Sequence, residues 1–383
     1  MNKVKLGIIG TGNMGSAHAK SLVAGLVPQL ELVAVADRRE DRRAKVVSIL
    51  PGVKVFSEGS ELIKSKMCDA VLIAVPHYQH PPLAIEAFNA GLHVMCEKPA
   101  GVYTSQVRKM NAVAEKSGLA FALMFNQRTS CLYRAMHDIV TGGDMGAIKR
   151  VSWIITDWYR TQSYYDSGDW RATWAGEGGG ALLNQCPHQL DLLQWICGMP
   201  NKVRAFCHNG KWHDIEVEDD VTAYLEYPNG ATGTFITSTA DAPGTNRFEV
   251  TLEMGKLVCE NNKLTQFLLA ENEREFCKKA KGGFDTPACT ERLIETDGQN
   301  EQHVGVLKAF GEHILHGTPL VANGKEGIFG LTLSNAMHLS SWLEKPLTLP
   351  LDEDLFLTEL DKRRANSKLK IATGVVFDTS SSY

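Results

Sequence analysis

The sequence lacks the features that mark membrane, secreted and metal-binding proteins. Its longest apolar run covers residues 70–76, far too short to cross a bilayer. Its N-terminus holds no apolar stretch of the length found in a secretory signal peptide. The nine cysteines are scattered and include no C-x-x-C pair, which indicates free thiols in a reducing compartment instead of disulfides or a thiolate zinc site. We therefore expect a cytoplasmic protein that binds no metal and no membrane.

The sequence also has no excess of charge of one sign, no low-complexity tract and no repeat of fixed period. Its 40 Lys and Arg residues stand against 44 Asp and Glu residues, so the formal charge is −4 and nothing attracts the chain to nucleic acid. Apolar residues make up 44% of the chain, which is ordinary for a globular protein. A length of 383 residues then predicts two domains.

The first 126 residues alternate short apolar runs with helical stretches. We predict strands over residues 4–9, 32–36, 53–56, 70–75, 93–96 and 120–125. We predict helices over residues 14–26, 39–49, 58–66, 81–90 and 104–117. Strict alternation of this kind implies a parallel sheet with helices on both faces, because each crossover helix packs back onto the sheet.

The pattern changes in residues 127–383. We predict helices over residues 131–141, 181–197, 301–317, 326–343 and 352–366, and a strand over residues 147–158. Residues 202–270 show alternating patterns divided by turn pairs such as Asn229-Gly230, which is typical of antiparallel hairpins. The second domain is therefore expected to be α+β, with a large, mainly antiparallel open sheet.

A glycine-rich segment follows the first predicted strand and fits the G-x-G-x-x-G pattern. The pattern suits a dinucleotide, because glycines permit a tight turn, a close approach of backbone to pyrophosphate, and close helix–strand packing. The N-terminus of the next helix offers N–H groups to the phosphates. We predict a Rossmann domain over residues 1–126. The expected cofactor contacts in the loop are Gly10, Thr11, Gly12, Asn13, Met14 and Gly15.

Asp37 ends the second predicted strand, 22 residues after Gly15, where a carboxylate would accept hydrogen bonds from the adenosine ribose. It would repel a 2′-phosphate, so the sequence favours NAD over NADP. NADP stays open as an alternative, because Arg38 directly follows and could hold that phosphate. The alternative without a ligand is that Arg38 and the arginines after it (Arg39, Arg42 and Arg43) form a solvent-exposed helix face.

Three further segments carry a family resemblance. Residues 75–80 (VPHYQH) lead to Glu97-Lys98-Pro99, and residues 178–195 contain three glycines followed by Asn184 and His188. Together with FNQR at 125–128 and GTNRFEV at 244–250, these segments resemble the glucose-fructose oxidoreductase / inositol dehydrogenase / rhizopine catabolism protein family. The resemblance implies an NAD(P)-dependent dehydrogenase of sugars, polyols or their derivatives.

In this family the lysine and the histidine flank the reacting carbinol, so the resemblance implies Lys98 and His188 as catalytic residues. Imidazole suits removal of the hydroxyl proton near neutral pH, and an ammonium group suits the developing alkoxide. Lys98 could instead be the base. Asn184 stands where the family usually has Asp, and we expect it to position His188 or a substrate hydroxyl. Asp191 could orient His188.

Other residues are expected on the cofactor or substrate side. The cofactor side is expected to include Val75, Pro76, His77, His80, Glu97, Lys98 and Arg171, although His80 could instead cap the helix that begins at residue 81. Residues 153–174 are rich in aromatic rings, which stack on sugar rings but could also be core. The substrate side is expected to include Gln127, Arg128, Arg160, Tyr164 and Trp170 besides Lys98, Asn184 and His188.

Two other functions fit the same residues. One is a redox-assisted lyase or glycosidase that recycles NAD within each turnover, and the other is a non-catalytic ligand sensor. The resemblance also implies a homodimer or homotetramer, with residues 202–270 at the subunit interface. The expected partners are thus a small-molecule sugar, polyol or glycoside and further copies of the chain.

Overall fold

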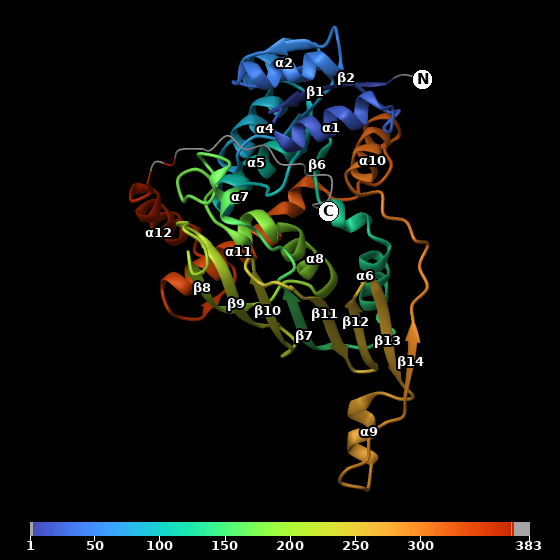
Figure 1. Ribbon diagram of the computed structural model, residues 1–383. Helices are drawn as coiled ribbons and strands as arrows, with labels where there is room; N and C mark the ends of the chain where they lie inside the picture. Colours follow the sequence, from blue (N-terminus) through green and yellow to red (C-terminus); the bar gives the residue numbers. More distant parts are fainter. Residues whose placement is uncertain (1–2, 369, 371–383) are drawn as a thin grey trace.

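The computed structural model describes residues 3–368 and residue 370. Its N-terminal part contains a six-stranded parallel sheet with the strand order β3-β2-β1-β4-β5-β6 (Figure 1). The strands are β1 (Val4–Ile9), β2 (Leu30–Ala36), β3 (Lys54–Phe56), β4 (Ala70–Ile73), β5 (His93–Cys96) and β6 (Phe121–Leu123). This order is that of a Rossmann fold, in which the dinucleotide crosses the carboxyl ends of the strands. The predicted fold of this part is confirmed.

Helices pack on both faces of this sheet. The crossover helices are α1 (Asn13–Val23), α2 (Glu40–Ile49), α3 (Gly59–Lys64), α4 (His80–Asn89) and α5 (Thr104–Ser117). A further helix, α10 (Gln302–His316), returns from the C-terminal part and buries Val306, Leu307 and Phe310 in the core around β1 and β2. The domain boundary at residue 126 stays a prediction, and α10 shows that the chain crosses it more than once.

The C-terminal part is built on a nine-stranded sheet with the order β14-β13-β12-β11-β7-β10-β9-β8-β15. All neighbouring strands are antiparallel except β7 and β10. The strands are β7 (Ile148–Ile155), β8 (Lys202–Asn209), β9 (Glu218–Glu226), β10 (Thr232–Ser238), β11 (Asn246–Leu252), β12 (Gly255–Glu260), β13 (Lys263–Leu269), β14 (Cys289–Leu293) and β15 (Leu347–Thr348). A large, mainly antiparallel sheet was predicted, and the prediction is confirmed.

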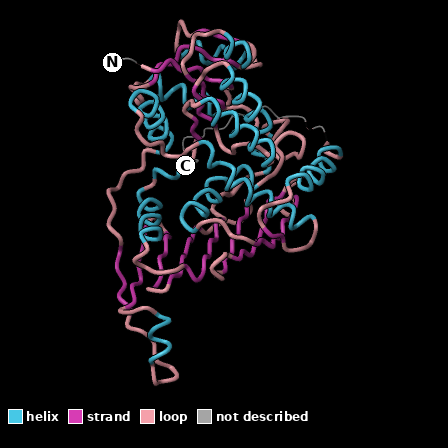
Figure 2. The backbone as a smooth tube through the Cα atoms, turned by 180° about the vertical axis from the view of Figure 1, so that it is seen from behind, coloured by secondary structure: helices cyan, strands magenta, loops and turns pink. Residues whose placement is uncertain are grey.

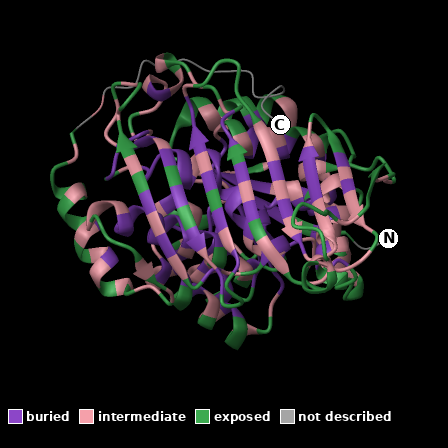
Figure 3. Ribbon diagram, turned by 90° about the horizontal axis from the view of Figure 1, so that it is seen from below, coloured by how far each residue is buried: buried purple, intermediate pink, exposed green. Residues whose placement is uncertain are grey.

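Helices cover one face of the nine-stranded sheet and leave the other open. The covering helices are α6 (Cys131–Gly142), α8 (Pro187–Cys197) and α11 (Gly327–Trp342), and the charged helix α12 (Glu353–Ala365) packs beside α11. Figure 3 looks onto the open face, where exposed and half-buried residues alternate with buried ones along the strands. Trp153 and Phe248 stack at the centre of the covered core, with ring centroids 4.0 Å apart.

Two features differ from the sequence prediction. The helix expected over residues 181–197 is divided into a π-helical turn (Ala181–Gln185) and α8, because Pro187 has no N–H group to continue the first turn. A projecting arm, residues 270–293, carries α9 (Glu273–Lys279) and β14, which the alternating pattern did not reveal (Figure 2). Among the described residues, no helix combines the length and the apolar character needed to cross a membrane.

Candidate active site

The glycine loop between β1 and α1 has the geometry of a phosphate site. Gly10 has φ +92°, and a Cβ atom there would lie 2.4 Å from the carbonyl oxygen of Ala74. A Cβ atom on Gly15 would lie 1.9 Å from the carbonyl oxygen of Gly10, so both positions require glycine. Helix α1 begins at Asn13 without a side-chain cap or an acidic residue in its first turn. Its N–H groups therefore suit an anion such as a pyrophosphate.

Asp37 lies directly after β2 and faces this loop. Its Oδ2 atom accepts hydrogen bonds from the backbone N–H of Thr11 (2.7 Å) and from the Thr11 hydroxyl (3.1 Å). Its Oδ1 atom accepts a hydrogen bond from the backbone N–H of Arg39 (2.9 Å), and the nearest guanidinium group is that of Arg42, with Nη1 at 3.8 Å from Oδ2. Arg38 points away, with a side chain that is 78% exposed and paired with Glu58. The predicted acid therefore lies beside the phosphate loop, whereas Arg38 lies apart from it.

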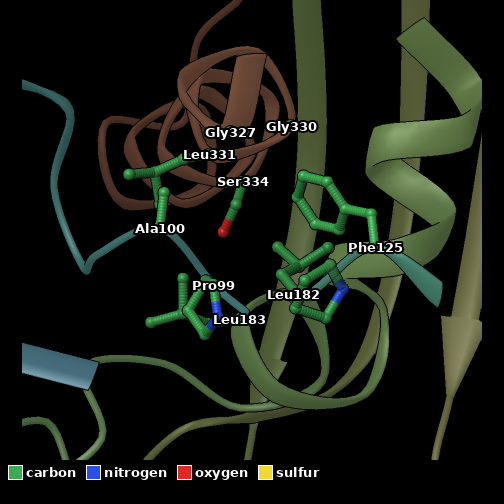
Figure 4. A pocket seen from close by; sticks show the side chains of 10 residues that line it. Pro99, Ala100, Phe125, Leu182, Leu183, Gly327, Gly330, Leu331 and Ser334 are labelled. Carbon is green, nitrogen blue, oxygen red and sulfur yellow. The ribbon is translucent and has the colours of Figure 1, made fainter. Parts of the chain in front are cut away.

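Lys98 follows β5 and extends toward the π-helical turn of the C-terminal part. Its Nζ atom donates a hydrogen bond to the backbone carbonyl of Asn184, at 2.7 Å. Burial lowers the pKa of Lys98, because water no longer stabilises the ammonium group. Behind the lysine, Pro99 and Ala100 line a small apolar pocket against α11 (Figure 4). This packing fixes the loop that carries Lys98.

Glu97 is buried next to Lys98, on the dinucleotide side. Its Oε1 atom lies 2.6 Å from Nε2 of His18, a residue of α1 that the sequence analysis missed. Burial alone would raise the pKa of Glu97, but the hydrogen bond to His18 and the charges of His18, His303 and Lys98 outweigh it and lower the pKa to about 2. His18 lies three residues after Gly15, on the inner face of α1, and that periodicity was the one available signal.

His188 lies in the first turn of α8, with 5% of its surface exposed. Its ring meets the edge of Phe125 at 6.1 Å, and its Nδ1 atom has no hydrogen-bond partner among the described residues. Burial, and then the charge of Lys98, lower the pKa of His188 well below its usual value. The ring is therefore neutral at pH 7 and keeps a nitrogen lone pair for a proton, and the same burial makes it a weaker base than a free imidazole.

The structure corrects two expectations around His188. Asp191 does not orient the imidazole, because its two oxygens accept hydrogen bonds from Nη2 and Nε of Arg128, both at 2.7 Å. Arg128 also bonds Glu326 through Nη1, at 2.5 Å. Since both ends of the buried guanidinium are held by these carboxylates, we no longer expect Arg128 to bind the substrate. Gln127 precedes it and is half-buried, and its substrate role stays a prediction.

The two histidines after β4 have different surroundings. His80 is fully buried, and its ring nitrogens lie 2.7 Å from the carbonyl oxygens of Val75 and Pro99. It joins the two loops, so it is neither a helix cap nor open to a cofactor. His77 lies 3.2 Å (Nδ1) from the carbonyl oxygen of Glu177 and meets the ring of Trp170 edge-on, at 5.8 Å. The residues from Val75 to His77 thus link the end of β4 in the parallel sheet to the aromatic segment, residues 153–174.

The aromatic segment brings together four of the predicted residues. Tyr164, in α7 (Gln162–Asp166), has two guanidinium groups near its ring, with Arg160 5.1 Å and Arg171 4.4 Å from the ring centre. Nη1 of Arg171 donates to the Tyr164 hydroxyl at 2.6 Å, and its guanidinium lies 4.7 Å from the ring centre of Trp170. The grouping was predicted, and the substrate and cofactor roles of these residues stay predictions.

Glu177 is the main residue of the site that the sequence analysis missed. It is 1% exposed, and its carboxylate accepts hydrogen bonds from the backbone N–H of Ala172 (2.6 Å) and from Nδ2 of Asn184. Burial raises its pKa to about 7, even though Arg171 lies 4.0 Å away. Its position directly before the three glycines was the one signal for it, and no periodic pattern marks it.

The site has the parts that a dinucleotide-dependent oxidoreductase needs: an uncapped helix start behind a glycine loop, and a half-buried lysine near a neutral imidazole. Within the described residues, no group of three or more His, Cys, Asp or Glu side chains could hold a metal ion. A family model described as "Oxidoreductase family, NAD-binding Rossmann fold" matches residues 4–125, and the GFO/IDH/MocA C-terminal domain matches residues 133–258. The chain belongs to this family, which confirms the resemblance and the NAD-binding domain.

Curated relatives match over long stretches. Myo-inositol 2-dehydrogenase of Thermotoga maritima is 24% identical over 91% of this chain and 99% of that protein. D-glucoside 3-dehydrogenase of Escherichia coli is 28% identical over 59% of this chain and 68% of that protein. Two solved structures share the fold. The WlbA dehydrogenase of Chromobacterium violaceum with NADH and UDP-GlcNAcA has a TM-score of 0.79, 24% identity, and coverage of 92% and 97%. Levoglucosan dehydrogenase with NADH and levoglucosan has a TM-score of 0.74 and 20% identity, and the match covers 91% of this chain and 100% of that chain.

Proposed function

We propose that this protein is an NAD-dependent dehydrogenase that oxidises a secondary alcohol of a sugar, polyol or glycoside. The observation that carries the proposal is the hydrogen bond from Lys98 to the Asn184 carbonyl, because it joins the end of the dinucleotide sheet to the turn before His188. The names of the relatives, which refer to inositol, D-glucosides and levoglucosan, support the substrate class.

The two side chains divide the proton chemistry. NAD, held by the glycine loop and the start of α1, would supply the hydride acceptor for the carbinol carbon. His188, held neutral by burial, accepts the hydroxyl proton as the primary base. Lys98 places its N–H groups beside the same oxygen and stabilises the developing alkoxide. Their opposite tasks suit their shared surroundings, since the low dielectric that keeps the imidazole neutral strengthens the attraction between ammonium and alkoxide.

The aromatic segment supports a sugar-like substrate. Trp170 and Tyr164 present flat apolar faces beside Arg160 and Arg171. Aromatic faces pack on the C–H groups of a sugar ring, and guanidinium groups donate to its hydroxyls. This arrangement accommodates a glycoside as well as a free sugar.

The test follows NADH formation by absorbance, with NAD and then NADP, across monosaccharides, inositols and glycosides. We expect NADH with at least one of them and a preference for NAD. Product formation without net NADH would instead support the redox-assisted lyase or glycosidase. Tight binding of a sugar without any turnover would support the sensor.

We also propose that the open sheet face is the interface of a homodimer or homotetramer. The strand register puts Ile154, Tyr224 and Phe206 on one face, and their exposed fractions are 36%, 42% and 51%. Exposed apolar side chains gathered in this way are typical of interfaces. Light scattering on the wild type and on Tyr224→Glu should show an oligomer that the substitution weakens.

A further inference from the structure

Glu177 connects three parts of the candidate site. Its carboxylate accepts hydrogen bonds from the backbone N–H of Ala172 (2.6 Å) and from the side-chain amide of Asn184. Its own carbonyl oxygen lies 3.2 Å from Nδ1 of His77. A carboxylate that is 1% exposed needs such donors, because burial without them would be very costly. Neither the sequence motifs nor the proton chemistry above gives this carboxylate a role.

The contact with Asn184 determines which way its amide points. An ionised carboxylate only accepts hydrogen bonds, so Asn184 turns its N–H group toward Glu177 and its Oδ1 atom the other way. The backbone carbonyl of Asn184 meanwhile accepts a hydrogen bond from Lys98. Within the described residues no hydrogen bond uses Oδ1 of Asn184, and the residue is half-buried. This oxygen is thus an available acceptor next to Lys98.

We propose, on the basis of the dehydrogenase function above, that Glu177 is a positioning residue whose ionised form holds the Asn184 amide so that Oδ1 accepts a hydrogen bond from a substrate hydroxyl. A protonated Glu177 donates its proton toward Oδ1 of Asn184, which turns the amide around and withdraws the acceptor. Glu177 therefore makes substrate positioning depend on pH without touching the substrate.

The groups that face Glu177 come from several elements. Arg171 lies 4.0 Å away, Lys98 approaches from the loop after β5, and His77 and Tyr165 lie on neighbouring segments. Burial keeps His77 neutral and raises the pKa of Tyr165, so neither changes charge near pH 7. Burial raises the pKa of Glu177 to about 7, so its charge does change in this range.

The first test measures protons and needs no turnover. NAD carries a positive charge on its nicotinamide ring and NADH does not, so NAD binding should release a proton from Glu177 at pH 7 and NADH binding should release less. Calorimetry in two buffers of different ionisation enthalpy gives both numbers. Glu177→Gln should abolish the difference between NAD and NADH. A difference of the same size in Glu177→Gln would overturn the proposal.

Glu216→Gln is the matched control. Glu216 also accepts a backbone N–H of the same segment, that of Trp174 at 3.2 Å, but its other partners are the hydroxyl of Ser367 and the backbone N–H of Lys368. This variant should keep the wild-type proton release. Thermal melting and NADH binding show that both variants are folded.

The second test uses the pH dependence of kcat/KM. The wild type should lose activity as the pH falls through about 7, as Glu177 takes up a proton. Glu177→Gln should lack this acidic limb and have kcat lower by about 10-fold. The double variant Glu177→Gln/Asn184→Asp exchanges the two groups, so that the amide is at position 177 and the carboxylate at position 184. It should recover part of kcat. Activity no better than that of the single variant would contradict a need for the carboxylate.

The two proposals fail in different ways. If no alcohol yields NADH with the wild type, the dehydrogenase function fails, and proton release on NAD binding still reports on Glu177. If the wild type is active but Glu177→Gln keeps both its acidic limb and its kcat, the positioning role fails and the dehydrogenase function stands.

Discussion

Two buried glutamates, Glu97 and Glu177, both act on the charge of Lys98, and they differ in the pH at which they ionise. Glu97 belongs to the dinucleotide side and is 5% exposed, and Glu177 belongs to the substrate side and is 1% exposed. The pKa of Glu97 is lowered to about 2, whereas that of Glu177 is raised to about 7. The two pKa values therefore move in opposite directions although the two carboxylates are buried to a similar depth.

The partners of the two carboxylates explain the difference. Glu97 lies 2.6 Å from the imidazole of His18, and the hydrogen bond to His18, together with the electrostatic contributions of His18, His303 and Lys98, outweighs the cost of burial. Glu177 accepts hydrogen bonds from two neutral groups, Ala172 N–H and the Asn184 amide, and its nearest cation is 4.0 Å away. Near pH 7 the Glu97 carboxylate therefore keeps its charge, whereas that of Glu177 changes with pH.

The largest effect is expected from removing the positive charge of Lys98. Lys98→Ala should lower kcat by about 10³-fold or more, because the developing alkoxide loses its positive partner. NADH binding, measured by fluorescence, should persist, since the glycine loop is unchanged. Activity within a few-fold of the wild type would contradict the dehydrogenase mechanism and would agree with a non-catalytic sensor.

A smaller effect is expected from Glu97→Gln. Loss of the buried contact with His18 should lower the free energy of unfolding by about 3 kcal/mol at pH 7. Since the folded pKa lies below the unfolded value, this stabilisation is present above the ordinary glutamate pKa and is lost as the pH falls toward about 2. Urea unfolding of the wild type and of Glu97→Gln at pH 7 and at the lowest pH where the fold persists measures this. The difference between their free energies of unfolding should be smaller at the lower pH. A constant difference would mean that charge is not the cause.

The smallest effect, with the opposite sign, is expected from Glu177→Gln. Its folded pKa lies above the unfolded value, so the wild type loses stability as the pH rises from about 4.5 to about 7. Removing the charge should raise the free energy of unfolding at pH 8 by about 1–2 kcal/mol, and by almost nothing at pH 4. Melting curves of both proteins at the two pH values measure this. Destabilisation at pH 8 would show that the hydrogen bonds of Glu177 outweigh the cost of its charge.

Sequence patterns predicted well what depends on neighbours along the chain. The loop from Gly10 to Gly15, the strand that ends before Asp37 and the alternation of hairpins over residues 202–270 are all local. Patterns failed where distant residues meet. His18 and Glu97 are 79 positions apart, and Arg128 and Asp191 are 63 apart, so no periodicity announces either pair. Helical periodicity also placed Asp191 beside His188, but the carboxylate is bound to Arg128 instead.

The sequence by itself determined the class of the protein, because glycine spacing, β–α alternation and the Glu97-Lys98-Pro99 tripeptide are short-range properties that evolve under steric and chemical demands of the cofactor. Only the tertiary structure decided the charge states around Lys98. A pKa depends on the distances to donors and charges and on the depth of burial, and these exist only once α1, the π-helical turn and the segment before Glu177 have packed together.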